Sequence, residues 1–232
     1  MKAHVGLSWR LPVSRRLVIF DADGTLVDTV EDVAECFNQA LVAAGYPSST
    51  LEGVAAQLGK PLEEIVRGIL PPSARGEDAA VAAVSKAYRQ AYAASPKSRT
   101  RPYPGVSEAL RKLVDSGMRI AVNSNKPHDN LVRLMDGFFG DLPLLVCGYG
   151  NVGIKSAKPD PEGARWLMAE AKVPPAETLY VGDTHIDVDT ASNAGVSCVV
   201  VAWGQGTDEL YRDPRIERVV TDTDELIAAC GR

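Results

Sequence analysis

The sequence predicts an α/β protein, a doubly wound parallel sheet interrupted by an inserted, all-helical cap. Three observations support this prediction. From Arg101 onward, amphipathic runs of helix length alternate with short β-branched runs, which is the pattern of repeated βα units. Residues 29–100 contain helix-like runs with no plausible strand between them. Two acids, Asp21 and Asp23, directly follow the apolar run Leu17–Phe20, which places them at the end of a buried strand.

The first predicted strand carries the most informative acids. Side chains at i and i+2 of an extended chain point to the same side, so Asp21 and Asp23 are expected to lie together. In open α/β sheets, ligands bind at the carboxyl ends of the strands. Two such acids repel each other unless a cation or a shared proton intervenes. A simple turn with a capping acid is the alternative, but it leaves a second acid pair, Asp183 and Asp187, unexplained.

The next elements form the insertion, in which apolar residues recur at helical spacing. Its helix-like runs are Glu31–Ala44, Leu51–Gln57, Leu62–Leu70 and Ala79–Ala93. A proline-rich stretch after Thr100 marks the return to the core. We therefore expect a core made of residues 15–28 and 101–232, and a helical cap at 29–100. The start of the chain is basic but lacks a continuous apolar segment, so residues 1–14 are expected to form a flexible extension.

The remaining elements alternate regularly along the chain. Proline at the first turn is tolerated by helices, which favours a helix beginning at Pro161. The predicted helices are Val106–Ser116, His128–Met135, Pro161–Ala171, Asp187–Ala194 and Thr223–Cys230. The predicted strands between them are Arg119–Asn123, Leu144–Cys147, Thr178–Val181, Ser197–Val201 and Arg218–Val220.

Composition narrows the functional classes. The 232-residue chain has 45% hydrophobic and 24% charged residues, which is ordinary for a globular protein. A net charge of -5 argues against a nucleic-acid or membrane-surface partner. The cysteines are widely spaced and include no C-x-x-C pair, as expected of free thiols in a reducing cytoplasm. No apolar run approaches the roughly 20 residues that span a bilayer, so we predict a cytoplasmic location.

Chemistry-bearing residues gather in segments at or just after the ends of predicted strands. They are Phe20-Asp21-Ala22-Asp23-Gly24-Thr25, Asn123-Ser124-Asn125-Lys126-Pro127, Lys158-Pro159-Asp160-Pro161 and Val181-Gly182-Asp183-Thr184-His185-Ile186-Asp187. In this order they resemble the motifs of the haloacid dehalogenase superfamily of phosphohydrolases. The resemblance covers the chain from Arg16 to its end and implies a Rossmann-like core. The helical cap, Asn-Lys-Pro and Lys-Pro-Asp-Pro are similar to phosphoglycolate phosphatases and their close relatives.

Phosphate monoesters are dianions that resist attack, so their hydrolysis needs a nucleophile, charge neutralisation and an acid for the leaving oxygen. Asp21 is the candidate nucleophile, which would form an aspartyl-phosphate. Asp23 is the candidate general acid and base. We expect the Ser124 hydroxyl to bind a phosphoryl oxygen, and Lys158 to bridge the phosphate and the nucleophile. A turn serine and a surface lysine are the alternatives.

An oxygen-rich site of this kind suits Mg²⁺, which binds one or two carboxylates together with substrate phosphate. The resemblance implies that Asp21, the backbone carbonyl of Asp23, and Asp183 are direct metal ligands. Asp187, four residues past Asp183, is expected to act through water or from outside the set of direct ligands.

Further residues are expected to contact the substrate. Thr25 and Asn125 belong to the motifs, and Lys60 lies in a Gly-Lys-Pro loop between predicted cap helices. In the resembled family such a loop faces the active site when the cap closes, so Lys60 is placed to meet a substrate carboxylate. An exposed loop lysine is the equal alternative. Lys126 is assigned no role, and for His185 a solvated or hydrogen-bonded role is preferred over metal binding.

The sequence therefore predicts a Mg²⁺-dependent phosphatase of a small phosphorylated metabolite, with 2-phosphoglycolate as the leading substrate. The alternatives are a phosphatase of other small monoesters or pyrophosphate and, from a different class, a catalytically idle binding or regulatory subunit. The similar hexose mutases usually have Glu-Asp where this chain has Gly182-Asp183, and dehalogenases lack the second acid, Asp23. A monomer or a homodimer is expected.

Overall fold

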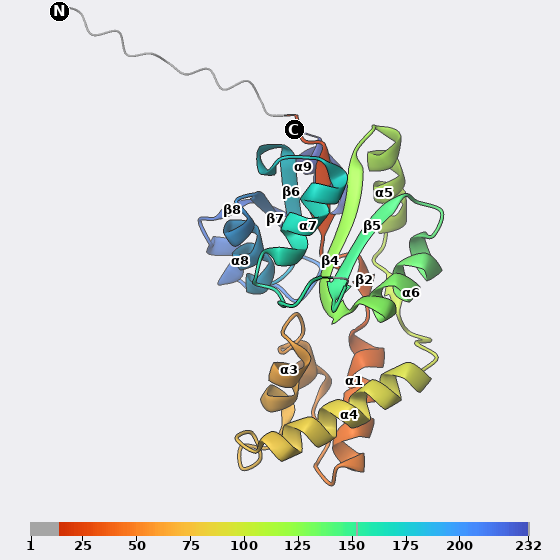
Figure 1. The fold of residues 1–232 in the computed structure, drawn as a ribbon, viewed down its shortest axis with the longest axis vertical. Helices are drawn as coiled ribbons and strands as arrows, with labels where there is room; N and C mark the ends of the chain where they lie inside the picture. The colour runs from red at the N-terminus through yellow and green to blue at the C-terminus, as the bar shows by residue number, and fades with distance from the viewer. Residues whose placement is uncertain (1–13, 152, 232) are drawn as a thin grey trace, which may run out of the picture.

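A computed structural model describes residues 14–151 and 153–231 of the chain. It contains a sheet-based core and a helical unit that lies beyond one end of the strands (Figure 1). Of the N-terminal extension expected at 1–14, residues 1–13 lie outside the described residues. In the described part of the chain, no helix combines the length and apolar character that crossing a bilayer would require.

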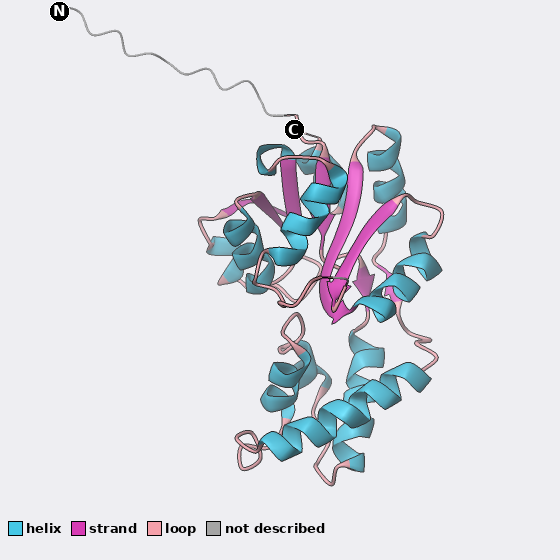
Figure 2. Cartoon of the chain, viewed as in Figure 1, coloured by secondary structure: helices cyan, strands magenta, loops and turns pink. Residues whose placement is uncertain are grey.

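The core is built on a parallel sheet, as predicted. Among the described residues, its six strands lie in the order β5-β4-β1-β6-β7-β8 (Figure 2). Their bounds are β1 Leu17–Phe20, β4 Arg119–Pro127, β5 Leu144–Tyr149, β6 Thr178–Gly182, β7 Ser197–Val201 and β8 Ile216–Val220. The central strand β1 pairs in parallel with both β4 and β6. The end of β1 therefore lies between the ends of two neighbouring strands.

Helices cover both faces of the sheet because its strands are apolar on both sides. In β1, Val18 and Phe20 pack into one hydrophobic cluster, and Leu17 and Ile19 pack into another. The first cluster includes side chains from α5 (Val106–Asp115), α6 (His128–Phe139) and α9 (Thr223–Cys230). The second includes side chains from α7 (Glu162–Ala171) and α8 (His185–Ala194). The doubly wound prediction is thus confirmed.

The inserted unit has a hydrophobic core of its own. Its helices are α1 Val30–Ala43, α2 Leu51–Ala55, α3 Leu62–Ile69 and α4 Asp78–Ala94. Their apolar faces form a third cluster, separate from the two that cover the sheet. Within it, the rings of Phe37 and Tyr88 stack with centroids 3.9 Å apart. We call this unit, residues 29–100, the cap.

Two segments of the chain, residues 27–30 and 95–102, join the cap to the core, and we call them the crossings. They contain β2 (Val27–Asp28) and β3 (Arg101–Pro102), which form a short antiparallel pair that the sequence analysis did not predict. The buried carboxylate of Asp32 in α1 accepts hydrogen bonds from the backbone N–H groups of Arg99 and Thr100, at 3.0 and 2.6 Å, and from the Thr100 hydroxyl at 2.7 Å. The returning crossing is therefore tied to the first cap helix.

Candidate active site

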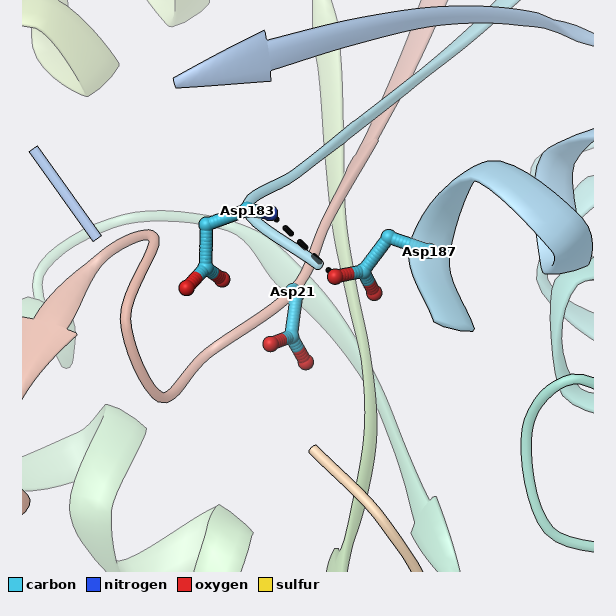
Figure 3. A group of neighbouring side chains, drawn as sticks. All are labelled: Asp21, Asp183 and Asp187. Atoms are coloured by element: carbon cyan, nitrogen blue, oxygen red, sulfur yellow. Dashed lines mark hydrogen bonds between the residues drawn. The ribbon is translucent and has the colours of Figure 1, made fainter. Parts of the chain in front are cut away.

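Three buried acids meet at the carboxyl end of the sheet. Asp21 follows β1, Asp183 follows β6, and Asp187 lies in the first turn of α8. One carboxylate oxygen of each lies within 4.8 Å of the others, and Figure 3 shows the three side chains around a shared space. Neighbouring parallel strands end at the same edge of the sheet, so residues 162 positions apart in the chain are brought together.

Lys158 supplies a fixed positive charge to this cluster. It lies in the loop between β5 and α7, and its Nζ is 2.7 Å from Asp21 Oδ1 and 2.7 Å from Asp187 Oδ1. Burial alone would lower the pKa of Lys158, but the two carboxylates outweigh that effect and raise it well above its usual value. Lys158 is therefore a permanent cation beside the proposed nucleophile.

The ionised form of Asp21 is unfavourable unless a cation in addition to Lys158 lies nearby. Burial is the main cause and raises the pKa of its carboxyl from 3.8 to about 7, although Lys158 lowers it. Repulsion from Asp187 and Asp23 adds to the rise. The carboxyl group is thus placed where another positive charge would stabilise its ionised form.

Asp187 organises the loop after β6. Its Oδ2 accepts hydrogen bonds from the N–H groups of Asp183 and Thr184 and from the Thr184 hydroxyl, which forms a capping box at the start of α8. Its Oδ1 accepts the bond from Lys158. With both oxygens used in this way, Asp187 is better suited to holding Asp183 and Lys158 than to binding a metal directly.

Asp183 is an acid whose ionised form a nearby positive charge would stabilise. It is fully buried, and burial together with repulsion from Asp187 and Asp21 raises its pKa well above the usual value. Its oxygens accept bonds from the Thr25 hydroxyl at 2.9 Å and the Gln205 N–H at 2.7 Å. Gly24 has a φ of +89°, and a side chain there would collide with the Asp183 carboxylate. The chain therefore packs its backbone closely around this acid.

These observations fit a hard divalent cation such as Mg²⁺. The cluster offers only oxygen donors, and one oxygen of each carboxylate lies within 4.8 Å of the others, which is close enough to share one ion.

Asp23 faces the cap side of the cluster. Its Oδ1 accepts a hydrogen bond from the Thr29 hydroxyl at 2.6 Å, and its Oδ2 is 3.1 Å from Lys126 Nζ. Lys126 also donates to the hydroxyl of Tyr92 on α4 at 3.2 Å. Asp23 is thus held by one group at the beginning of the cap and one group of the core.

The irregular end of β4 contains Ser124 and Asn125. The register of β4 with β5 shifts between Ser124 and Pro127, so the strand continues four residues beyond the predicted end at Asn123. Asn125 exchanges hydrogen bonds with the backbone of Lys158 and also donates to the cap carbonyl of Gly59 at 2.9 Å. Asn125 therefore connects two core loops with the cap.

A cavity of about 80 Å³ lies between the cluster and the cap. Asp21, Asp23, Ser124 and Lys158 belong to its core side. Its cap side is mainly apolar and aromatic and also carries Lys60. The cap residues that line it are Thr29, Val33, Phe37, Leu58, Gly59, Lys60, Leu62, Ile65, Tyr88, Arg89 and Tyr92.

The structure thus brings most of the proposed site residues to one cavity. Thr25 is an exception, because its buried hydroxyl is directed to Asp183 and it does not line the cavity. Lys60 lines the cavity and donates to Gln57 Oε1 at 2.8 Å. His185 is exposed at the start of α8. Sequence reasoning missed Tyr92, because an aromatic residue in an amphipathic helix gives no signal beyond packing.

The comparisons with known proteins agree with this geometry. The family described as Haloacid dehalogenase-like hydrolase matches residues 18–201. The chain belongs to this family.

Similar family members include phosphoglycolate phosphatases of pseudomonads. That of Pseudomonas syringae pv. tomato is 34% identical over 219 residues, which cover 93% of this chain and 79% of the relative. Phosphoglycolate phosphatase 1 of Pseudomonas aeruginosa is 35% identical over 200 residues, covering 84% and 71%. A solved structure from Lactobacillus delbrueckii subsp. bulgaricus, provisionally named a phosphoglycolate phosphatase, superposes with a TM-score of 0.85 at 25% identity, covering 94% of this chain and 98% of that one.

Proposed function

We propose that this haloacid dehalogenase-like hydrolase is a Mg²⁺-dependent phosphatase that cleaves a small phosphate monoester through an aspartyl-phosphate. One observation carries the proposal: the buried carboxylate of Asp21 lies beside a charged lysine and lines a cavity whose other side is formed by the cap. Such an arrangement offers a nucleophile and a fixed positive charge in a partly enclosed site.

In the first step, an Asp21 oxygen attacks phosphorus and the bond to the leaving alkoxide breaks. Asp23 donates its proton to that alkoxide, so the released product is an alcohol. Lys158 holds the other side of the Asp21 carboxylate and offers positive charge to a phosphoryl oxygen. Ser124, which lines the cavity, donates its hydroxyl to another phosphoryl oxygen.

In the second step, Asp23 acts as a base. It takes a proton from a water molecule whose oxygen attacks the phosphorus of the aspartyl-phosphate. The bond to Asp21 breaks, inorganic phosphate leaves, and the Asp21 carboxylate is restored. The contacts from Thr29 and Lys126 fix the orientation of Asp23 for both proton transfers.

Asp21, Asp183 and the backbone carbonyl of Asp23 are the proposed metal ligands, with Asp187 outside the direct set. The bound cation would offset the negative charge of the phosphoryl group and of the acids that surround it.

The leading substrate is 2-phosphoglycolate. The relatives named phosphoglycolate phosphatase support it, and so does the cavity of about 80 Å³, which is small beside the roughly 300–1,000 Å³ of common ligand pockets. Lys60 on the cap side offers a cation for the substrate carboxylate. Binding energy gained there would be expressed in the chemical step once the cap covers the substrate.

A panel of phosphorylated metabolites tests the proposal. We expect Mg²⁺-dependent turnover, with a higher kcat/KM for 2-phosphoglycolate than for a sugar phosphate, a nucleotide or pyrophosphate. Lys60→Ala should reduce that preference and change aryl phosphate hydrolysis little, and Lys86→Ala on the outer part of α4 is a matched control. Equal rates on all substrates would remove the substrate assignment. No turnover of any of them would instead favour a binding or regulatory subunit.

A further inference from the structure

Lys126 is a buried cation with one partner in each half of the molecule. Its side chain is 7% exposed and extends from the end of β4. On the core side, its Nζ is 3.1 Å from Asp23 Oδ2. On the cap side, it donates to the Tyr92 hydroxyl at 3.2 Å and lies 4.9 Å from the centre of the Tyr92 ring. A single ammonium group therefore connects the proposed acid and base with a cap helix.

Both partners are needed to hold this charge. A buried ammonium is costly unless charged and polar groups surround it. Burial would lower the pKa of Lys126, but the Asp23 carboxylate, together with the hydrogen bond to Tyr92, outweighs that effect and raises the pKa above its usual value. A cation close to an aromatic ring gains a further attraction that is strongest when water is excluded. Movement of Tyr92 away from the core would therefore rehydrate Lys126 and weaken its hold on Asp23.

Tyr92 is well fixed within the cap. Its ring lies 5.7 Å from that of Tyr88, which stacks on Phe37 of α1. Five residues after Tyr92, in the returning crossing, Lys97 Nζ donates to the Tyr92 carbonyl at 2.8 Å and lies 4.4 Å from the centre of the Tyr92 ring. Because these contacts come from α1, α4 and the returning crossing, the position of Tyr92 follows the position of the cap as a whole.

Asp23 in turn depends on Lys126 for its orientation. Thr29 holds Oδ1 from the start of the cap, and Lys126 holds Oδ2. With one oxygen held, a carboxylate still turns about its side-chain bonds; with both held on different sides, its plane is defined. A misplacement of about 1 Å at a reacting group is enough to cost a large factor in rate.

We propose that Lys126 is a positioning residue: through Tyr92, it couples the orientation of Asp23 to closure of the cap on the core. The inference rests on the proposed role of Asp23 as acid and base. It explains why the lysine two residues after Ser124 contacts Asp23, the second acid after β1. It also assigns a role to a tyrosine that would otherwise belong only to the cap core.

A double-mutant cycle tests the coupling. Lys126→Met, Tyr92→Leu and the double variant are compared with the parent, using ethyl phosphate and 4-nitrophenyl phosphate. Each single change should lower kcat for the alkyl ester on the order of tenfold more than for the aryl ester, whose leaving group needs less protonation. The double variant should lose little more than the worse single variant. Losses that multiply would overturn the coupling.

Amide hydrogen exchange supplies a readout that is independent of catalysis. Loss of Lys126 or Tyr92 should speed exchange in the two crossings, residues 27–30 and 95–102, because the cap opens more often. Unchanged exchange in Lys126→Met would overturn the proposal even if activity falls. If the parent turns over no phosphate ester, the proposed function fails, and the exchange data still decide whether Lys126 and Tyr92 hold the cap.

Matched variants separate this role from a merely structural one. Tyr46→Leu changes a half-buried tyrosine that packs against the cap core and does not line the cavity, and it should preserve the alkyl-to-aryl ratio. Lys126→Arg keeps the charge and should restore part of the alkyl activity. Should thermal melts show that Tyr92→Leu is unfolded, Tyr92→Phe takes its place in the cycle, because it removes the hydroxyl and keeps the ring.

Discussion

Replacing the proposed nucleophile should make the metal-free protein more stable while it abolishes turnover. Asp21→Asn keeps the size of the side chain but removes a charge that the fold holds at a cost. Burial is the main cause of this cost and raises the pKa of Asp21 from 3.8 to about 7. The variant should therefore have a higher free energy of unfolding than the parent near neutral pH, in the presence of a chelator.

The magnitude and its pH dependence follow from proton linkage. A carboxyl group whose pKa is higher in the folded state binds more protons there than in the unfolded chain, so stability falls as pH rises. For Asp21 this fall spans the window from about pH 4 to pH 7. A rise of about three pH units corresponds to about 4 kcal/mol at 1.36 kcal/mol per unit. Because Asp21→Asn also removes one of the two carboxylate partners of Lys158, this figure is an upper limit, and a gain of about 1–4 kcal/mol is expected at pH 7 and above.

Urea unfolding of the parent and Asp21→Asn at pH 4, 5.5 and 7, each with chelator or with Mg²⁺, measures this difference. The advantage of the variant should be small at pH 4, should grow toward pH 7, and should shrink when Mg²⁺ stabilises the parent. A variant that is less stable than the parent at pH 7 without metal would refute the reasoning. Measurable turnover by highly purified Asp21→Asn would refute the covalent mechanism.

Three further substitutions test the proposed acid, a proposed metal ligand and the contact that ties the returning crossing to the cap. Asp23→Asn should slow hydrolysis of an alkyl phosphate more than that of an aryl phosphate, and equal losses in steady-state rates would remove Asp23 from the acid role. Asp183→Ala should raise the Mg²⁺ concentration needed for half-maximal activity, because it deletes a proposed direct ligand. An unchanged Mg²⁺ titration would transfer that role, with Asp187 as the first candidate. Asp32→Ala should lower the free energy of unfolding by about 2–4 kcal/mol, since it leaves the N–H and hydroxyl of buried Thr100 and the part-buried N–H of Arg99 without their acceptor. A melting temperature equal to that of the parent would contradict this estimate.

The core of the site was predictable from sequence because it depends on local order. Asp21 follows a strand whose apolar residues face both sides of the sheet, and Asp183 follows the neighbouring strand β6. Any parallel pairing of these strands brings their ends to the same edge. The alternating pattern that predicts the strands therefore also predicts that the acids meet, without knowledge of the cap.

The cap contacts were not predictable in the same way. Tyr92 reaches Lys126 only because the two crossings set the direction of the cap, and that direction depends on contacts between distant residues. Asp32, for example, binds backbone groups 67 and 68 positions away. The register shift at the end of β4 likewise arises from its pairing with β5. Neither the periodicity nor the composition of a segment carries this information.

The balance of charge links the stability of the site to its chemistry. In the described part of the chain, the carboxylates of Asp21, Asp23, Asp183 and Asp187 face the ammonium groups of Lys126 and Lys158. Fully ionised, these groups have an excess of two negative charges, and a phosphate monoester would bring two more. Lys126 and Lys158 are already paired with these acids, so attraction of a dianion into the cavity depends on Lys60 and Arg89 of the cap side and on a metal held by the acids. A divalent cation held by these acids would offset that excess and would favour the ionised form of Asp21. Burial and, to a smaller extent, repulsion between the acids disfavour the charge of Asp21. The same two effects that weaken the metal-free fold would therefore make the proposed nucleophile depend on a metal.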